Sequence, residues 1–227
     1  QKTKEYVKQE LANDSSGHDW WHIHRVTETA KTIAKAEKAN IFIVELAALL
    51  HDLGDHKLFK GDNAQEELIT KLLKKHQCSS ELIKTILSIV KSVSYKGAHV
   101  KTIPLTLEGK IVQDADRLDA IGAIGIARAF AYGGHHNRLM YHPDQTPELH
   151  DNFESYKNSQ GHTINHFYEK LLLLKDRMQT HTGKELAKNL NSKLIIIKGA
   201  GHFNTEAGYT EFKLLLKDTK KIIAKDL

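Results

Sequence analysis

The sequence predicts an all-α fold, and three observations lead to that prediction. Leu, Ile, Val and Ala recur at helical spacing through most of the 227 residues. Only three prolines interrupt the pattern. The apolar run at 194–197 is the one convincing buried strand, and no second strand is present with which it could pair. We therefore expect one helical domain at 1–187, followed at 188–227 by an atypical strand, turn and helix that do not form an independent domain.

Capping residues and apolar periodicity place the helices in the first half of the chain. A short helix at 4–11 ends in a loop rich in Asn, Asp and Ser. Asp19 is a suitable N-cap for a helix at 20–34, because the apolar positions that follow it recur every three or four residues. The same two criteria place further helices at 64–75 and 79–90.

The segment 41–52 combines a buried helix with two polar residues that are costly to bury. Its apolar part carries one charge, at Glu45, which indicates a helix buried on nearly all sides. The segment ends at His51 and Asp52, a pair that proteins rarely bury unless it binds something. Consecutive side chains leave a helix about 100° apart, so both can converge on one metal ion.

The second half of the chain begins with one expected long helix at 107–132. Gly122 and Gly125 lower its helix propensity but let another helix approach closely. At 133–162 the helical pattern gives way to a long loop rich in His, Asn, Asp and Pro, which is typical of binding segments. A helix at 163–178 follows before the C-terminal segment begins.

Composition and charge argue against several classes of protein. The formal net charge is +5, but the lysines are dispersed among acids, which fits anionic small molecules and not a nucleic-acid interface. No apolar run approaches the roughly 18 residues of a membrane span, and the N-terminus lacks a signal-peptide core. The one cysteine, Cys78, cannot form an intramolecular disulfide. We therefore expect a cytoplasmic protein without a membrane partner, and we leave a homodimer open.

Two imidazoles and two carboxylates from three expected helices make up a candidate metal site. They are His22, His51, Asp52 and an aspartate at position 114 or 116. Mixed nitrogen and oxygen ligation suits Mn, Fe, Co, Ni or Zn. Mg prefers more oxygen ligands, but the carboxylates and water can compensate, so Mg stays an alternative. Arg25 lies one turn after His22 on the same helix face, where it can reach an anion bound to the metal. This arrangement is typical of a phosphate hydrolase.

Three segments resemble the signature segments of HD-domain metal-dependent phosphohydrolases. They are His22-Ile-His-Arg25-Val, His51-Asp52-Leu-Gly-Asp55 and Gln113-Asp114-Ala-Asp116-Arg117-Leu-Asp119-Ala-Ile-Gly-Ala. Their flanks, over about 18–187, are similar to the bacterial YpgQ-like nucleotide pyrophosphohydrolases. The resemblance implies an HD-domain helical bundle that hydrolyses a phosphoanhydride bond of nucleoside triphosphates or diphosphates by metal-activated water, with one divalent ion, preferably Mn.

The resemblance also implies roles for individual residues. The metal ligands would be His22, His51, Asp52 and Asp116, with Asp116 preferred to Asp114 because the family segment is Ala-Asp-Arg/Lys-Leu. Asp55 would be the general base or would orient the water. Arg25 and Lys57 would assist catalysis, and the phosphate contacts would be Arg25, Lys57 and Lys96.

Other functions stay open at this point. Within the same chemistry, the chain could be a phosphodiesterase or nucleotidase that acts on a signalling nucleotide. From a different class, it could be a metal-dependent nucleotide sensor without turnover. The C-terminal segment resembles the end of small α/β serine hydrolases, in which a strand and a turn present the catalytic histidine. No Gly-x-Ser-x-Gly motif is present, so we assign no catalytic role to His202 and disfavour a serine esterase.

Overall fold

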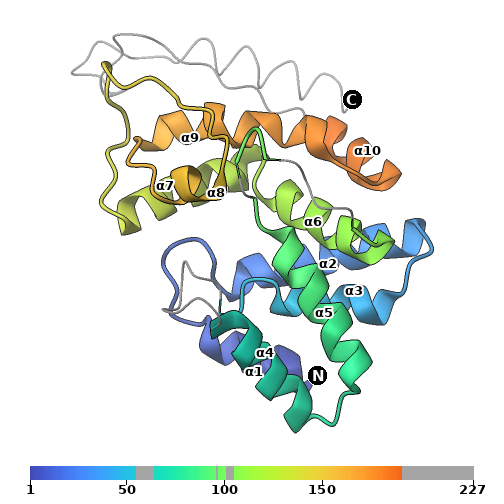
Figure 1. The fold of residues 1–227 in the computed structure, drawn as a ribbon. Coiled ribbons are helices and arrows are strands. Elements are labelled where there is room, and N and C mark those ends of the chain that lie inside the picture. The colour runs from blue at the N-terminus through green and yellow to red at the C-terminus, as the bar shows by residue number, and fades with distance from the viewer. Residues whose placement is uncertain (55–63, 96, 101–104, 191–227) are drawn as a thin grey trace, which may run out of the picture. The chain divides into compact units, whose positions relative to one another are not determined.

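The computed structural model describes residues 1–54, 64–95, 97–100 and 105–190, which all lie within one unit of the chain, Gln1–Ser192. Its described residues form helices and contain no strand, which confirms the predicted all-α class. The helices are α1 (Lys2–Glu10), α2 (Trp20–Ala36), α3 (Ile41–Leu50), α4 (Ala64–Lys75), α5 (Ser80–Val93), α6 (Leu107–Asp119), α7 (Gly122–His135), α8 (Phe153–Lys157), α9 (Thr163–Glu169) and α10 (His181–Leu190) (Figure 1).

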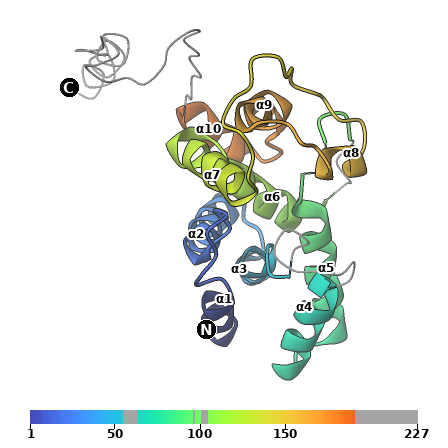
Figure 2. The same cartoon turned by 90° about the vertical axis from the view of Figure 1, so that its left-hand side faces the viewer.

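The core forms where α2 packs against both α3 and α6, with α5 against α3 and α6. Apolar residues spaced three or four apart on α2, including Ile23, Val26 and Ala30, are fully buried there. As predicted, α3 is apolar and buried over most of its length, and its first turn alone is exposed, at Ile41 and Phe42. Figures 1 and 2 both show α8 and α9 on the other side of α6 from α2 and α3.

The helix predicted at 107–132 is in fact two helices. The first, α6, ends at Asp119, and α7 begins at Gly122, whose φ is +74°. Only glycine adopts this left-handed backbone readily. A side chain added at Gly125 would place its Cβ 2.3 Å from the carbonyl oxygen of Ala120. The two glycines therefore allow the break and the close return of the chain at Ala120, and not the close approach of a separate helix that the sequence predicts.

The helix predicted at 163–178 is also shorter than expected. The helix α9 ends at Glu169, and two 3-10 turns, Leu171–Leu173 and Lys175–Arg177, follow it. The hydroxyl of Tyr95 donates to the carbonyl of Glu169 over 3.0 Å, which takes the acceptor that a continuing helix would use. The predicted loop likewise contains the last turn of α7 and the short helix α8.

The last described helix, α10, was not expected from the sequence, and it runs across the predicted domain boundary at 187. The division into domains therefore stays a prediction. The predicted strand at 194–197, the last helix and His202 lie outside the described residues. Within the described ranges, every helix is too short or too polar to pass through a bilayer.

Candidate metal centre

Asp119 holds the buried His22 in one orientation. Asp19 caps α2 by accepting the backbone N–H of His22, which places this histidine in the first turn of the helix. The His22 side chain is buried, and its Nδ1 lies 2.7 Å from Oδ2 of Asp119. Because an ionised carboxylate can only accept, Nδ1 carries the proton and Nε2 keeps its lone pair.

His51 and Asp52 come directly after α3. Nδ1 of His51 donates to the carbonyl of Ala48 over 2.8 Å, so in the neutral form of the ring Nε2 of His51 also keeps its lone pair. This Nε2 lies 3.2 Å from Nε2 of His22. Two lone pairs at such a distance repel each other, so the pair of rings needs a proton or a cation close to both nitrogens.

Carboxylates from α6 and from the end of α3 complete the cluster. Oδ2 of Asp52 lies 3.1 Å from Nε2 of His22 and 3.5 Å from Nε2 of His51. Oδ1 of Asp116 lies 3.5 Å and 3.6 Å from the same two nitrogens. The structure thus brings together all four residues predicted to bind the metal.

Asp114 points away from this cluster, toward the start of α10. Its carboxylate accepts the backbone N–H groups of Gln179 and Thr180 and the hydroxyl of Thr180, at 2.7 to 3.0 Å. Burial raises the pKa of Asp114 despite these hydrogen bonds. The two aspartates that the sequence left as alternatives therefore have different surroundings, and only Asp116 lies at the cluster.

The donor atoms of the cluster residues lie close enough together to hold a divalent ion. Ligand atoms about 2.1 Å from a common ion lie about 3.0 Å apart in octahedral geometry and about 3.4 Å apart in tetrahedral geometry. The separations between donor atoms given above run from 3.1 to 3.6 Å. Two imidazole nitrogens and two carboxylate oxygens also form a donor set that first-row divalent metals prefer.

The buried charges of the cluster shift the pKa values of its members. Burial by itself would lower the pKa of His51, but the carboxylates of Asp52 and Asp116 raise it to about 9. Burial would raise the pKa values of Asp52 and Asp116, but neighbouring histidines hold both well below the usual range. A proton and a metal ion would therefore compete for the same site.

Arg25 does not face the ligand cavity described below. Its Nε donates to Oδ1 of Asp119 over 2.7 Å, and its Nη2 donates to Oδ2 over 3.1 Å. This pairing raises the pKa of Arg25. Arg25 lies on the same helix face as His22, as predicted. Its guanidinium, however, pairs with the nearby carboxylate of Asp119 and not, as predicted, with an anion at the metal. The other predicted catalytic and phosphate-binding residues, Asp55, Lys57 and Lys96, lie outside the described residues.

A cavity of about 320 Å³ opens beside the cluster, within the size range of small-molecule sites. It reaches from the metal cluster to residues of α8 and α9. Its wall combines acidic and histidine side chains of the cluster with four basic and three tyrosine side chains: His18, His51, Asp52, Asp116, Arg117, Arg128, Arg138, Lys170, Tyr95, Tyr132 and Tyr156.

Comparison with known proteins identifies the family. Residues 20–121 match the HD domain. The chain is 38% identical to the Bacillus subtilis protein YpgQ over 191 residues, which cover 84% of this chain and 85% of YpgQ. The chain belongs to the HD-domain family. HD domains bind divalent metals, and this HD-domain protein is accordingly a metal-dependent phosphohydrolase.

Solved structures of HD-domain relatives have the same fold. A Lactobacillus plantarum protein is 40% identical, with a TM-score of 0.75 and coverage of 83% of this chain and 87% of that one. Bacillus subtilis YpgQ in complex with ADP is 37% identical, with a TM-score of 0.62 and coverage of 83% and 87%. An HD-superfamily hydrolase from Bacillus thuringiensis is 42% identical, with a TM-score of 0.61 and coverage of 83% and 86%.

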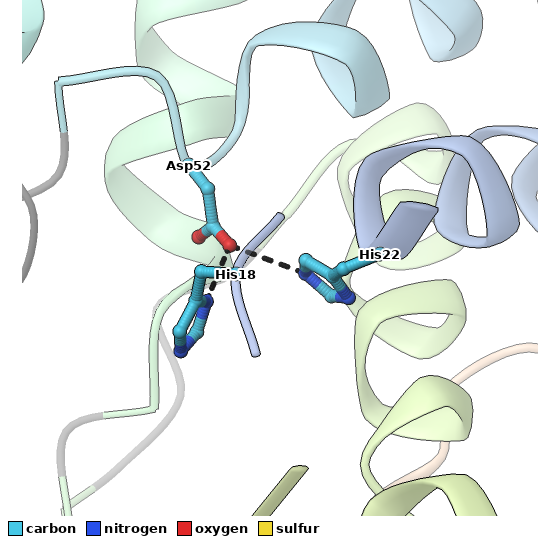
Figure 3. Close-up of side chains that lie close together, drawn as sticks. All are labelled: His18, His22 and Asp52. Carbon is cyan, nitrogen blue, oxygen red and sulfur yellow. Dashed lines mark hydrogen bonds and ion pairs between the residues drawn. The ribbon is translucent and has the colours of Figure 1, made fainter. Parts of the chain in front are cut away.

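Sequence analysis missed two residues of the HD-domain site. Nδ1 of His18 lies 2.7 Å from Oδ2 of Asp52, the same oxygen that faces His22 (Figure 3). His18 precedes the N-cap of α2, so helical periodicity could not place it. The second residue, Asp119, carried a usable signal, because it follows Asp116 by three positions and so shares a face of α6 with it.

Proposed function

We propose that this HD-domain protein hydrolyses nucleoside triphosphates, or diphosphates, at a phosphoanhydride bond, with Mn as the preferred ion. The observation that carries the proposal is the opening of the four-residue cluster into a cavity whose wall also contains basic side chains. Nucleotide as the substrate class is supported by the ADP complex of the relative YpgQ.

The residues of the cluster suit this reaction by their protonation and position. A divalent ion bound by His22, His51, Asp52 and Asp116 supplies Lewis acidity toward phosphate and an activated water. Because Asp119 and Ala48 hold the Nδ1 protons of the two histidines, both Nε2 atoms are oriented as ligands before any ion arrives. This preorganisation spares the site the cost of reorientation during catalysis.

Basic side chains of the cavity wall would neutralise the phosphates. Arg117 and Arg128 border the cavity, and Arg128 is close to the cluster because its Nη1 lies 3.2 Å from Oδ2 of Asp119. We therefore add Arg128 to the proposed phosphate contacts, and we assign Arg25 to the support of Asp119. Lys57 and Lys96 stay proposed phosphate contacts.

The general base is proposed to be Asp55, on the family resemblance alone. An acid at this position follows the His51 and Asp52 pair by three residues. A carboxylate near the attacking water can accept its remaining proton.

Product identification tests the proposal most directly. The protein would be assayed with a panel of nucleotides in Mn, Mg, Co and Zn, and products would be identified by mass spectrometry. We expect a nucleoside triphosphate to yield a monophosphate and pyrophosphate in Mn, and Asp52→Ala to abolish turnover. Orthophosphate and a diphosphate as products would show that a different bond is cleaved. Metal-dependent nucleotide binding without turnover would overturn the enzymatic proposal in favour of a sensor.

A further inference from the structure

The end of the cavity away from the metal cluster has aromatic walls. Tyr156, on α8, is the centre of this end, with its ring centroid 5.2 Å from that of Tyr95 and 6.4 Å from that of His166. In Figures 1 and 2, α8 and α9 lie on the other side of α6 from α2 and α3. The metal cluster is made of residues from α2, from α6 and from the two positions that follow α3. Flat aromatic walls favour a planar or apolar group over a compact phosphate.

Glu169, the last residue of α9, brings a buried carboxylate to this end. It is 5% exposed and borders the cavity. Among the described residues of the wall, it is the one acidic residue outside the metal cluster. Its Oε1 accepts the backbone N–H of Glu148 over 3.1 Å, and the described residues provide no hydrogen bond to its Oε2. The second carboxylate oxygen is therefore available to accept a hydrogen bond from a ligand in the cavity.

The cations near Glu169 are engaged with the wall itself. Nη2 of Arg138 donates to the carbonyl of Ser159 over 2.9 Å, and Nζ of Lys170 lies 5.4 Å from the ring centroid of Tyr95. This end therefore presents both signs of charge together with aromatic rings. Such surroundings suit a neutral group with N–H or O–H donors, whereas the carboxylate repels a phosphate.

We propose that Glu169 is a specificity-determining residue that binds the nucleoside part of the substrate and excludes phosphate from this end of the cavity. The inference rests on the proposed function and deepens it. The site would accept nucleoside phosphates with their phosphates at the metal cluster, and it would reject inorganic polyphosphates, which carry charge but no donors for Oε2.

A matched pair of non-hydrolysable ligands tests the inference without turnover. Calorimetric titration in Mg would compare α,β-methylene-ADP with methylenediphosphonate, which has the same two phosphorus atoms and no nucleoside. We expect the wild-type protein to bind the nucleotide about 10- to 100-fold more tightly, the effect of one hydrogen bond to a charged group. Equal affinity for the two ligands in the wild-type protein would overturn the inference, and this arm does not depend on the folding of any variant.

Glu169→Gln probes the residue itself with little change in shape. The one amide oxygen of the glutamine can still accept the N–H of Glu148, which turns its NH₂ group toward the cavity. We expect the nucleotide to bind about 10- to 100-fold more weakly and the diphosphonate to bind no more weakly than in the wild type. Unchanged affinities, or equal weakening of both ligands, would contradict the proposal.

Glu148→Gln is the control, because the Glu148 side chain is exposed and only its backbone contacts Glu169. It should bind both ligands as the wild type does, and the same loss of nucleotide affinity in this variant would remove Glu169 from the explanation.

Failure of the Glu169 proposal can be distinguished from failure of the proposed function. Absence of hydrolysis with every nucleotide and metal would refute the enzymatic proposal alone, whereas metal-dependent hydrolysis without discrimination between the two ligands would refute the role of Glu169 alone.

Discussion

The carboxylate of Asp119 lies 2.7 Å from Nδ1 of His22 and orients the histidine at the centre of the metal cluster. The same carboxylate accepts from Arg25 and lies 3.2 Å from Nη1 of Arg128. These contacts lower the pKa of Asp119 although burial would raise it. Asp119 is thus ionised and fixed, as a residue that positions a metal-binding histidine must be.

Asp119→Asn should weaken metal binding by about 10- to 100-fold, because the amide no longer stabilises the His22 tautomer that offers Nε2. Titration of the metal-free protein with Mn, followed by calorimetry, measures the change. Asp144→Asn alters an exposed aspartate and should leave the affinity unchanged. Wild-type affinity in Asp119→Asn would show that the contact does not support the site.

Metal should stabilise the folded protein. At a metal concentration about 100-fold above Kd, the free energy of unfolding should rise by about 2.7 kcal/mol. For a domain of this size the melting temperature should then rise by about 5 to 10 °C. Differential scanning fluorimetry with and without EDTA would measure it. Asp52→Ala should lose the metal-dependent rise, and a rise of wild-type size in that variant would place the ion elsewhere.

Asp114 and Asp116 should differ in the property that each substitution affects. Asp116→Ala removes a carboxylate from the cluster, so Mn binding and hydrolysis should be lost while the fold persists. Asp114→Ala leaves the N–H groups of Gln179 and Thr180 without their acceptor, which should cost about 2 to 4 kcal/mol of unfolding free energy. Urea unfolding and Mn titration of both variants would check this, and the reverse pattern would contradict the assignment.

Gly125 and Gly134 form a matched pair on α7. Gly125→Ala places a Cβ 2.3 Å from the carbonyl oxygen of Ala120 and should destabilise the protein by about 1 to 3 kcal/mol. No atom lies within 4 Å of a Cβ built at Gly134, so Gly134→Ala should stabilise the helix by about 0.5 to 1 kcal/mol. Chemical denaturation distinguishes the two, and similar effects at both sites would argue against the close return of the chain at Ala120.

Glu37 should make a small pH-dependent contribution to stability. Its Oε1 accepts the backbone N–H of Thr182 over 2.7 Å, and this hydrogen bond lowers the pKa of Glu37. A carboxyl whose folded pKa lies below its unfolded value stabilises the fold above the unfolded value of about 4.3, and the effect is lost as pH falls through the folded value.

Glu37→Gln should therefore cost about 0.3 to 0.5 kcal/mol at about pH 7, a small value because the side chain is only partly buried, and the cost should be smaller at about pH 3. Urea unfolding at both pH values measures the difference. Glu5→Gln, at an exposed position of α1, is the comparison variant. An equal cost of Glu37→Gln at both pH values would rule out the electrostatic origin.

Much of the fold was predictable because local rules decided it. Asp19 caps α2 as expected, and Ser79, one of the two serines that could begin the helix predicted at 79–90, caps α5. A side-chain acceptor next to apolar periodicity is a local signal. The break at Ala120 and the early end of α9 were not predictable, because they depend on contacts with residues distant in sequence or on backbone angles. Propensity is a weak guide where such contacts compete with it.

The amino-acid sequence by itself determined the helical class and three residues of the metal cluster, His22, His51 and Asp52, because a buried helix that ends in His51 and Asp52 needs partners of that chemistry. Only the tertiary structure decided between Asp114 and Asp116. Two positions on one helix differ by about 200° in direction, so α6 turns one carboxylate to the cluster and the other to α10. The orientation of α6 is set by its packing on α2, α5 and α10 and not by its own residues alone.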